Sequence, residues 1–295
     1  MFDISELIEV MRTTAEALFQ ESMARPQIQW QKVATSVDSQ HALYKANWLG
    51  SPPAMRPFKG RVDVAPVYPH DYTIEVLEHA VAVGVKLRTL RESGLVDFAT
   101  VVRQMTDAAT YYYDKLVFEQ MSDGFTDLCF DGAAFYSASH SWGKSGTYDN
   151  LDTAVLSDTS LVTARKTIHT AKNDQGEPMG YVVSDITVHP NLWKTALDIV
   201  GVAILSGGGE NVLKSLVNVI ESPWLKTEDE WHVGANGGPT KPFLLVEQLP
   251  IQMDDDTQSG DSKFWNHAVH FQVQAEAAPG LGLPQQAYGS TGAGP

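Results

Sequence analysis

Nine histidines and one cysteine carry the side chains best suited to metal binding, so their spacing is the first test for chemistry. Only His267 and His270 lie close together, three residues apart in a stretch that alternates like a strand. Side chains alternate between the two faces of a strand, so these two rings would point to opposite sides. A single cysteine, Cys129, can form neither an internal disulfide nor a cysteine zinc site. The sequence predicts no metal site, and a buried apolar environment for Cys129 between Leu128 and Phe130.

Three other polar clusters resemble fragments of known sites. The Gly-Lys-Ser triplet at 143–145 resembles the end of a phosphate-binding loop, but Ala138 stands where such a loop has a glycine. The Asp triplet at 254–256 lacks the alternate spacing and central glycine of a calcium loop, which favours a solvated acidic loop. Serines flank His140 in 137–141, without the strained turn of a hydrolase nucleophile. No catalytic or cofactor-binding set is therefore predicted, and no cofactor.

The overall charge limits the classes of partner. The chain has 36 acidic and 21 basic residues, a formal net charge of −15. An acidic surface repels polyphosphate, which argues against sequence-specific recognition of nucleic acid. No apolar run approaches the roughly 20 residues that span a bilayer, and the N-terminus lacks the basic-then-apolar order of a signal peptide. We expect a soluble protein made in the cytoplasm, with no membrane partner.

The first 91 residues contain little that could form a compact core. Apolar residues at helical spacing predict one amphipathic helix over 4–19, and the polar stretch 27–41 reads as a loose continuation of an arm. Between 51 and 91, prolines exclude a helix, and apolar residues alternate over 81–87 as in a strand. This segment is locally basic, which indicates an extended hairpin that docks onto the acidic surface of another copy through Arg56, Lys59, Arg61, Lys86, Arg88 and Arg91.

A long periodic segment follows, from Leu95 to Met121, and Gly124 ends it. A helix of this length would measure roughly 40 Å, and helices well beyond the usual 11–12 residues act as spines for larger structures. Three consecutive tyrosines at 111–113 cannot all face one core, so at least one would face solvent or another chain. The apolar face of the helix includes Phe98, Val102, Met105, Tyr112 and Leu116.

The second half reads as a compact α+β region. Its pattern predicts helices over 158–171 and after Pro190, a strand over 181–188, and a buried apolar segment over 212–220. Two more strands are predicted over 243–249 and 268–275. The last sixteen residues are rich in Gly, Pro, Ala and Ser, which is typical of a mobile tail.

From roughly Trp48 onward, the chain contains short sequence motifs in an order that is similar to that of a known family. They are Trp48-Leu49-Gly50, Met55-Arg56-Pro57-Phe58-Lys59-Gly60, Tyr72-Thr73-Ile74, Phe130-Asp131-Gly132 with Phe135, Ser139-His140, Asp174-Gln175-Gly176-Glu177-Pro178-Met179-Gly180, Ser222-Pro223-Trp224-Leu225, Trp231, and Lys241-Pro242-Phe243. Each motif is weak alone, but their shared order is more specific. The chain resembles the Mu-like phage major head subunit family, and its order of elements resembles the Hong Kong 97-like capsid fold of tailed phages.

The resemblance implies an α+β fold with named parts. They are an N-terminal arm (1–50), an E-loop hairpin (51–92), a P-domain with the spine helix (93–180), an A-domain (181–240), return strands of the P-domain (241–278) and a C-terminal tail (279–295). The six basic residues of the E-loop would then contact neighbouring subunits, and the apolar face from Phe98 to Leu116 would belong to the spine helix.

The resemblance also implies a function that needs no catalytic site. A major capsid protein would self-assemble as pentamers and hexamers into an icosahedral head, in the host cytoplasm and then in the virion. Its partners would be further copies of itself, a portal, scaffold, protease or decoration proteins, and packaged double-stranded DNA bound without sequence specificity. Two alternatives stay open: an encapsulin-like nanocompartment shell, and a soluble hydrolase that uses Ser139 or His140.

Overall fold

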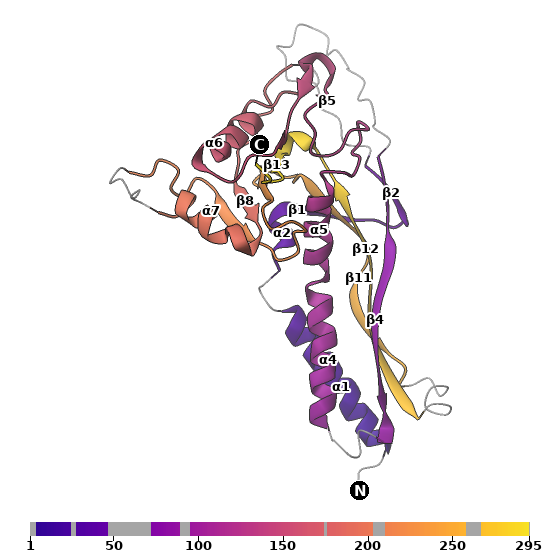
Figure 1. Ribbon diagram of the computed structural model, residues 1–295. Coiled ribbons are helices and arrows are strands. Elements are labelled where there is room, and N and C mark those ends of the chain that lie inside the picture. The colour runs from indigo at the N-terminus through magenta and orange to yellow at the C-terminus, as the bar shows by residue number, and fades with distance from the viewer. Residues whose placement is uncertain are drawn as a thin grey trace, which may run out of the picture.

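The chain is long and tapered, with a narrow part of long helices and strands and a broader part built on a second sheet (Figure 1). The computed structural model describes residues 4–24, 28–46, 72–88, 95–173, 176–202, 210–257 and 267–294. Among these residues, every helix is too short or too polar to pass through a lipid bilayer.

Two successive helices, α4 (Leu95–Thr110) and α5 (Tyr112–Asp123), form the spine of the narrow part. The sequence predicts one continuous helix here, but the structure interrupts it at Tyr111. The hydroxyls of Thr106 and Thr110 donate to the main-chain carbonyls of Arg103 and Thr106, a pattern that weakens and bends helices. The helix α1 (Ile4–Met23) runs alongside α4 (Figure 1).

A four-stranded sheet lies against the spine in the order β1-β11-β12-β4. Only β1 and β11 are parallel, and the other neighbours are antiparallel. The two long strands extend well beyond the predicted segments. The bounds are β1 (Ala34–Asp38), β4 (Leu77–Lys86), β11 (Phe243–Asp255) and β12 (Ala268–Leu281), with a separate ribbon of β2 (Leu43–Lys45) and β3 (Thr73–Glu75).

The stretch 27–41 is not a loose arm in the residues described. It contains the short helix α2 (Trp30–Val33) and strand β1, and Trp30 is buried. The buried carboxylate of Asp114 on α5 accepts the main-chain N–H groups of Gln29 and Trp30, with Oδ1 at 2.9 and 2.7 Å. Burial raises the pKa of Asp114 above its usual value, although these two N–H groups oppose the shift. The N-terminal segment is therefore anchored to its own spine.

The core of the narrow part fills the space between the helices and the sheet. Phe98, Val102 and Met105 on α4 are almost fully buried, and they pack with the inward face of α1 and with β12. The rings of Phe98 and Phe271 lie 5.3 Å apart between centroids. The amphipathic pattern of α1 and α4 is thus satisfied within the chain, because each helix buries its apolar face against the other and the sheet.

The broader part contains a five-stranded sheet in the order β7-β13-β10-β8-β9. Helices α6 (Asp158–His169) and α7 (Trp193–Val200) pack beside it (Figure 1). Its strands are β7 (Leu151–Asp152), β8 (Asp185–Val188), β9 (Asn218–Glu221), β10 (Trp231–Gly234) and β13 (Ala287–Ser290), and a small ribbon joins β5 (His140–Ser141) to β6 (Thr147–Tyr148).

The expected mobile tail is wrong for residues 279–294. Strand β13 lies between β10 and β7, and all four of its residues are buried. A Cβ added at Gly289 would lie 2.7 Å from the Tyr136 ring, so the small side chains allow close packing here. A composition that is typical of flexible tails instead permits a strand to approach an aromatic ring.

The predicted buried segment over 212–220 is also wrong in part. Val212 is 90% exposed, and only the last residues of the segment enter strand β9. The side-chain amide of Asn211 donates to the carbonyls of Ile199 and Val202, which fixes a turn ahead of the strand. The apolar residues of this segment follow the turn instead of a regular buried element.

Candidate subunit interface and its buried supports

Strand β4 carries the described part of the predicted E-loop. It pairs along its whole length with β12 of the same chain, from Leu77 opposite Ala277 to Lys86 opposite Ala268. Lys86 is exposed at the end of the strand, and Arg88 is exposed two residues later. The other four predicted contact residues, Arg56, Lys59, Arg61 and Arg91, lie outside the described residues. The alternating valines therefore form a strand, but this strand belongs to the sheet of its own chain.

The predicted spine residues serve the fold more than an outer surface. Phe98, Val102 and Met105 are buried, and Leu116 packs against a second cluster around Trp30. Of the three consecutive tyrosines, Tyr113 is buried and the other two are half-buried. The spine thus buries most of its apolar face within the chain, and Tyr111 and Tyr112 stay partly accessible to other contacts.

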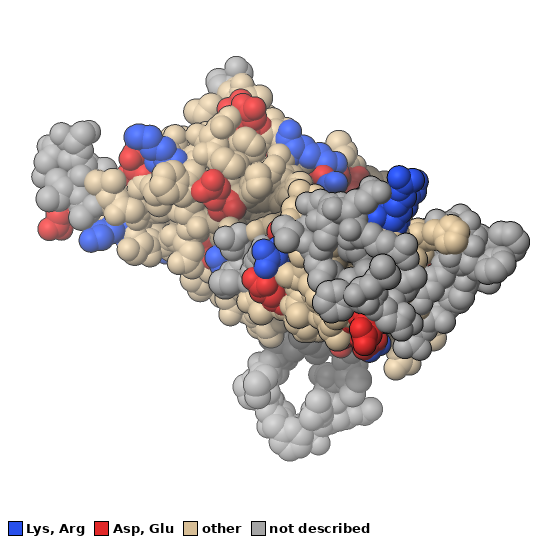
Figure 2. Space-filling model, turned by 90° about the horizontal axis from the view of Figure 1, so that it is seen from below, with Lys and Arg blue, Asp and Glu red and all other residues tan. Residues whose placement is uncertain are grey.

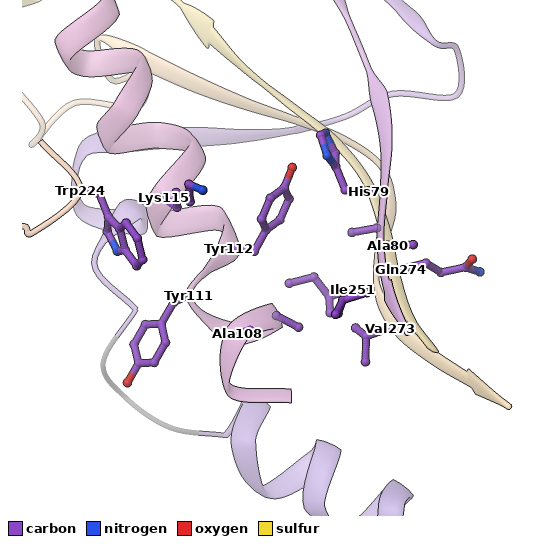
Figure 3. A pocket seen from close by; sticks show the side chains of 13 residues that line it. His79, Ala80, Ala108, Tyr111, Tyr112, Lys115, Trp224, Ile251, Val273 and Gln274 are labelled. Carbon is purple, nitrogen blue, oxygen red and sulfur yellow. The ribbon is translucent and has the colours of Figure 1, made fainter. Parts of the chain in front are cut away.

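An apolar cavity of about 370 Å³ opens beside the interruption of the spine (Figure 3). It lies between the helices and the strands β4, β11 and β12, and Trp224 closes one side. The Tyr112 hydroxyl is buried and has no hydrogen-bond partner among the described residues. Burial raises the pKa of this tyrosine to about 12. The lining, which includes His79, Tyr111, Ile251 and Val273, favours binding of apolar groups over catalysis.

One cluster that sequence reasoning missed joins Cys129, Asp131 and His140. The Asp131 carboxylate accepts from His140 Nδ1 at 2.7 Å, from Cys129 Sγ at 2.9 Å and from the Ala133 N–H at 3.0 Å. Burial by itself raises the pKa of Asp131, but these hydrogen bonds outweigh burial and lower it to about 2. Burial, and to a lesser extent the side-chain hydrogen bond to Asp131, raise the pKa of the Cys129 thiol to about 12. Cys129 is buried as predicted, but its surroundings are polar.

The other side of the His140 ring also faces acceptors. Its Nε2 lies 3.1 Å from the Phe135 carbonyl and 3.2 Å from Asn150 Oδ1. The orientation of Asn150 is fixed, because its amide nitrogen donates to three carbonyls and its oxygen accepts from Ser137 N–H. Both ring nitrogens of His140 therefore face oxygen acceptors, and the ring is held in one orientation between Asp131 and the Phe135–Asn150 side of the site.

This cluster has the donor types of a metal site, with ligand atoms all within 4.8 Å of one another. Every one of those atoms already has a hydrogen-bond partner, so a metal is not required to satisfy them. The same contacts weaken the hydrolase hypothesis, because His140 is 0% exposed and engaged at both nitrogens. The motifs Phe130-Asp131-Gly132 and Ser139-His140 contain two of these residues. The sequence alone does not show that they come into contact.

Two other polar clusters are more ordered than predicted. The first two residues of the Asp triplet lie in β11, and Asp256 accepts from His270 Nδ1 at 2.7 Å. His267 stands just before β12 with a positive φ of 50°, so it is not a strand partner of His270. The Gly-Lys-Ser triplet forms a single 3-10 turn in which the Ser145 hydroxyl donates to the Asn173 carbonyl. Instead of a solvated acidic loop, the triplet continues β11 and ends in a pair of Asp256 with His270.

A buried carboxylate connects the spine to the broader part. Glu230 is 2% exposed and accepts from the Ser122 hydroxyl on α5. Burial raises the pKa of Glu230, while the Ser122 hydroxyl and the main-chain N–H groups of Thr227 and Lys226 oppose that rise. Lys226 Nζ also lies 2.5 Å from Asp123 Oδ1 at the end of α5. These contacts hold the two parts of the molecule in one arrangement.

Strand β10 places a second histidine, His232, in the core. Its burial predicts that the folded state loses stability in acid. Burial lowers the pKa of His232 to about 3, and the unfolded state protonates near 6.5. Because the unfolded chain then binds more protons, stability falls as pH drops from about 6.5 towards 3, by up to about 1.4 kcal/mol per pH unit. Urea unfolding midpoints between pH 7 and 4.5 should show this slope, and His232→Leu should reduce it.

The exposed His41 supplies the matched control for that measurement. His41→Gln should keep the slope of the unmodified chain, because the change lies on the surface and leaves the buried His232 ring in place. An unchanged slope in His232→Leu would contradict the assignment of the acid sensitivity to the buried ring.

Charged side chains lie interspersed on the face seen from below, with acidic and basic groups often adjacent (Figure 2). Several described pairs are exposed, such as Lys194–Asp198 at 2.6 Å. Exposed pairs contribute about 0–1 kcal/mol each, so stable contacts between copies would need many of them together with apolar area.

Solved structures that resemble this chain come from particle shells. The chain is similar to a chain of the procapsid of bacteriophage JBD30, with 20% identity, a TM-score of 0.59, and coverage of 97% of this chain and 75% of that chain. It is also similar to a chain of a virus-like particle from Pyrococcus furiosus, with 11% identity, a TM-score of 0.56, and coverage of 93% and 96%. The fold is thus the α+β Hong Kong 97-like capsid fold, which confirms the predicted fold class.

The sequence comparisons narrow this class to one family. A family model described as the Mu-like prophage major head subunit gpT matches residues 8–155 and 151–225, more than half of the chain. The chain belongs to this family. The match begins at residue 8, well before the first motif that carried the resemblance, and ends before the motifs around Lys241.

Two curated relatives carry names from the same family. The chain is 26% identical over 145 residues to the major capsid protein of Escherichia phage Mu, covering 49% of this chain and 46% of that protein. It is 25% identical over 147 residues to the Mu-like prophage FluMu major head subunit of Haemophilus influenzae, covering 49% and 48%. The chain spans about half the length of the curated relatives it matches.

Proposed function

We propose that this chain is a major capsid subunit that assembles with copies of itself into the closed icosahedral head of a Mu-like phage or prophage. The observation that carries this proposal is the family match, which extends over the N-terminal helix, the spine and much of the broader part. The capsid fold supports it independently. Within the head, pentamers and hexamers would enclose double-stranded DNA, and the acidic surface would keep the wall from adhering to it.

The same proposal assigns the residues a structural role instead of a catalytic one. The buried pairs around His140 and Glu230 hold the shape of the subunit, and both nitrogens of the His140 ring are already engaged, away from Ser139. A portal, a scaffold, a protease and decoration proteins would be additional partners in the virion. Residues 51–92 would reach a neighbouring subunit, and Lys86 and Arg88 would be their contacts in the described part.

Sedimentation and negative-stain microscopy of the purified full chain test this function. We expect fast-sedimenting closed shells of uniform diameter that form without any other phage protein or with a co-expressed scaffold. A protein that stays monomeric or dimeric at high concentration under both conditions would contradict the proposal.

An encapsulin-like compartment with protein cargo is the second candidate, since the chain resembles the Pyrococcus furiosus particle along most of its length. The nucleic-acid content of particles isolated from lysogen or infected cells separates the two. Nuclease-resistant double-stranded DNA favours the phage head, and enclosed protein without DNA favours the compartment.

Charge reversal at the exposed end of β4 should impair assembly. The variant Lys86→Glu/Arg88→Glu reverses two exposed cations that we assign to contacts with the acidic surface of another copy. We expect a severalfold lower yield of shells at low ionic strength, while the unassembled subunit still unfolds cooperatively. Lys194→Glu on the exposed surface of α7 is the matched control and should assemble normally. Normal yield in the double variant would argue against this contact.

A further inference from the structure

Strand β4 has one edge that no strand of the described residues occupies. Its ten residues pair with β12 along one side, and β4 is the outermost strand of its sheet (Figure 1). An edge of this length presents a row of main-chain donors and acceptors to a further strand. Natural edges are often protected by proline or a bulge, and β4 contains no proline and pairs with β12 in unbroken register.

The two faces of β4 differ in a way that limits how another strand could add to it. Val83 and Val85 pack towards the α1–α4 core, and His79 contacts the Tyr112 ring at 4.9 Å between centroids. The alternate residues, from Glu78 to Lys86, are exposed on the opposite face. Leu77 and Val81 belong to the core-side set but remain 53% and 38% exposed, so apolar area is available at this edge.

The sequence of β4 is self-complementary when read against an antiparallel copy of itself. If Ala82 lies opposite Ala82 of a second copy, residues of one face meet residues of the same face, as the pleat requires. The opposed pairs within the strand would be Glu78 with Lys86, His79 with Val85, Ala80 with Gly84, and Val81 with Val83.

In this register Glu78 of each copy lies opposite Lys86 of the other copy, so the two-fold symmetry gives two such pairs. Neither Glu78 nor Lys86 forms an ion pair among the described residues, so both are available to a second copy. Opposite charges directly across two strands stabilise the pair by roughly 0.2–1 kcal/mol. The small residues at the centre, Ala80, Ala82 and Gly84, let the two strands approach without a clash.

We propose that β4 pairs antiparallel with β4 of a second copy, centred on Ala82, and so joins two four-stranded sheets into one continuous sheet. The contact is isologous, with a two-fold axis through the two central alanines. The occupant of the edge is therefore a second copy of this chain. This inference rests on the proposed self-assembly and specifies one of its contacts.

Disulfide trapping tests the pairing in assembled particles. Opposed Cα atoms across an antiparallel pair lie about 4.5–5.5 Å apart, within the range a disulfide can bridge. Ala82→Cys should therefore give a covalent dimer on mild oxidation of shells, seen on a non-reducing gel. The unmodified chain is the first control, because its single cysteine, Cys129, is buried.

A matched pair of variants checks the register. In Glu78→Cys alone, the two introduced thiols would lie about 26 Å apart, eight residues of strand, and should not cross-link. Glu78→Cys/Lys86→Cys places a thiol opposite each partner and should cross-link as readily as Ala82→Cys. A charge exchange supports the same point: Glu78→Lys should lower shell yield severalfold, and Glu78→Lys/Lys86→Glu should restore it.

The outcomes separate this inference from the function on which it rests. Intact shells without a covalent dimer in Ala82→Cys, or with equal cross-linking in Glu78→Cys alone, would overturn the β4 pairing and leave the capsid function standing. Cross-linked dimers that never form shells under any condition would support the pairing and contradict the capsid function.

Discussion

Removal of residues 284–295 is expected to abolish the folded state of the broader part of the molecule. The deletion takes strand β13 out of the sheet from between β10 and β7, so β7 loses the strand it pairs with and β10 keeps only β8. It also removes Tyr288, which is buried in the same core as Trp231 and whose hydroxyl donates to Asp152 at 2.9 Å. Circular dichroism and thermal melting of the truncated chain should show loss of cooperative unfolding.

Two further variants distinguish the effect of losing strand β13 from the effect of shortening the chain. Deletion of residues 294–295 alone removes one main-chain bond, from Gly294 N–H to the Thr153 carbonyl, and should change the melting temperature little. Gly289→Val keeps the length but places a side chain against Tyr136, where even a Cβ would lie 2.7 Å from the ring. Overpacking of this kind typically destabilises by about 1–3 kcal/mol. A truncated chain that melts like the full one would show that this strand is dispensable.

The buried pair of His140 and Asp131 carries the second large expected effect. His140→Ala leaves the Asp131 carboxylate without its imidazole hydrogen-bond partner and removes the ring nitrogen that lies 3.1 Å from the Phe135 carbonyl. A buried hydrogen-bonding group that loses its partner destabilises the folded state by about 1–3 kcal/mol, and by more where that group is charged. The free energy of unfolding in urea should fall by that amount, while His41→Ala, at an exposed position, should change it by less than about 0.5 kcal/mol.

A double-mutant cycle tests whether the two side chains act as a pair. Because they share one interaction, the double variant Asp131→Asn/His140→Ala should lose less stability than the sum of the single variants. The lowered pKa of Asp131, about 2, adds a pH signature. Its stabilising effect is present above the unfolded value near 3.9 and is lost as pH falls from there towards 2. Additive losses, or a low-pH slope unchanged in Asp131→Asn, would contradict the pair.

Periodicity was enough to predict the elements that a single stretch of sequence determines. The apolar stripe of α4 and α5 predicted a spine helix, and the alternating valines predicted strand β4. The interruption at Tyr111 was missed, because the hydroxyl bonds that weaken the helix there do not alter the apolar period. Where local pattern and tertiary position agree, the prediction holds to within a few residues.

The remaining errors concern contacts between distant segments. The C-terminal composition indicated a mobile tail, but the close approach of Gly289 to Tyr136 depends on a residue 153 positions earlier in the chain. The cluster of Cys129, Asp131 and His140 was missed for the related reason that a loop must close to join them. The spacing of residues in a sequence does not show which residues a loop brings together. A set of motifs in the same order as in a known family indicates the fold, and so indicates these contacts indirectly.

A cryo-electron microscopy reconstruction of particles formed by the full chain is the most direct measurement of the central claim. The account predicts a closed icosahedral shell in which copies of this fold form pentamers and hexamers, with the outer edge of β4 against another copy. Particles that fail to close, or a small discrete oligomer in which this edge contacts only its own chain, would contradict the claim.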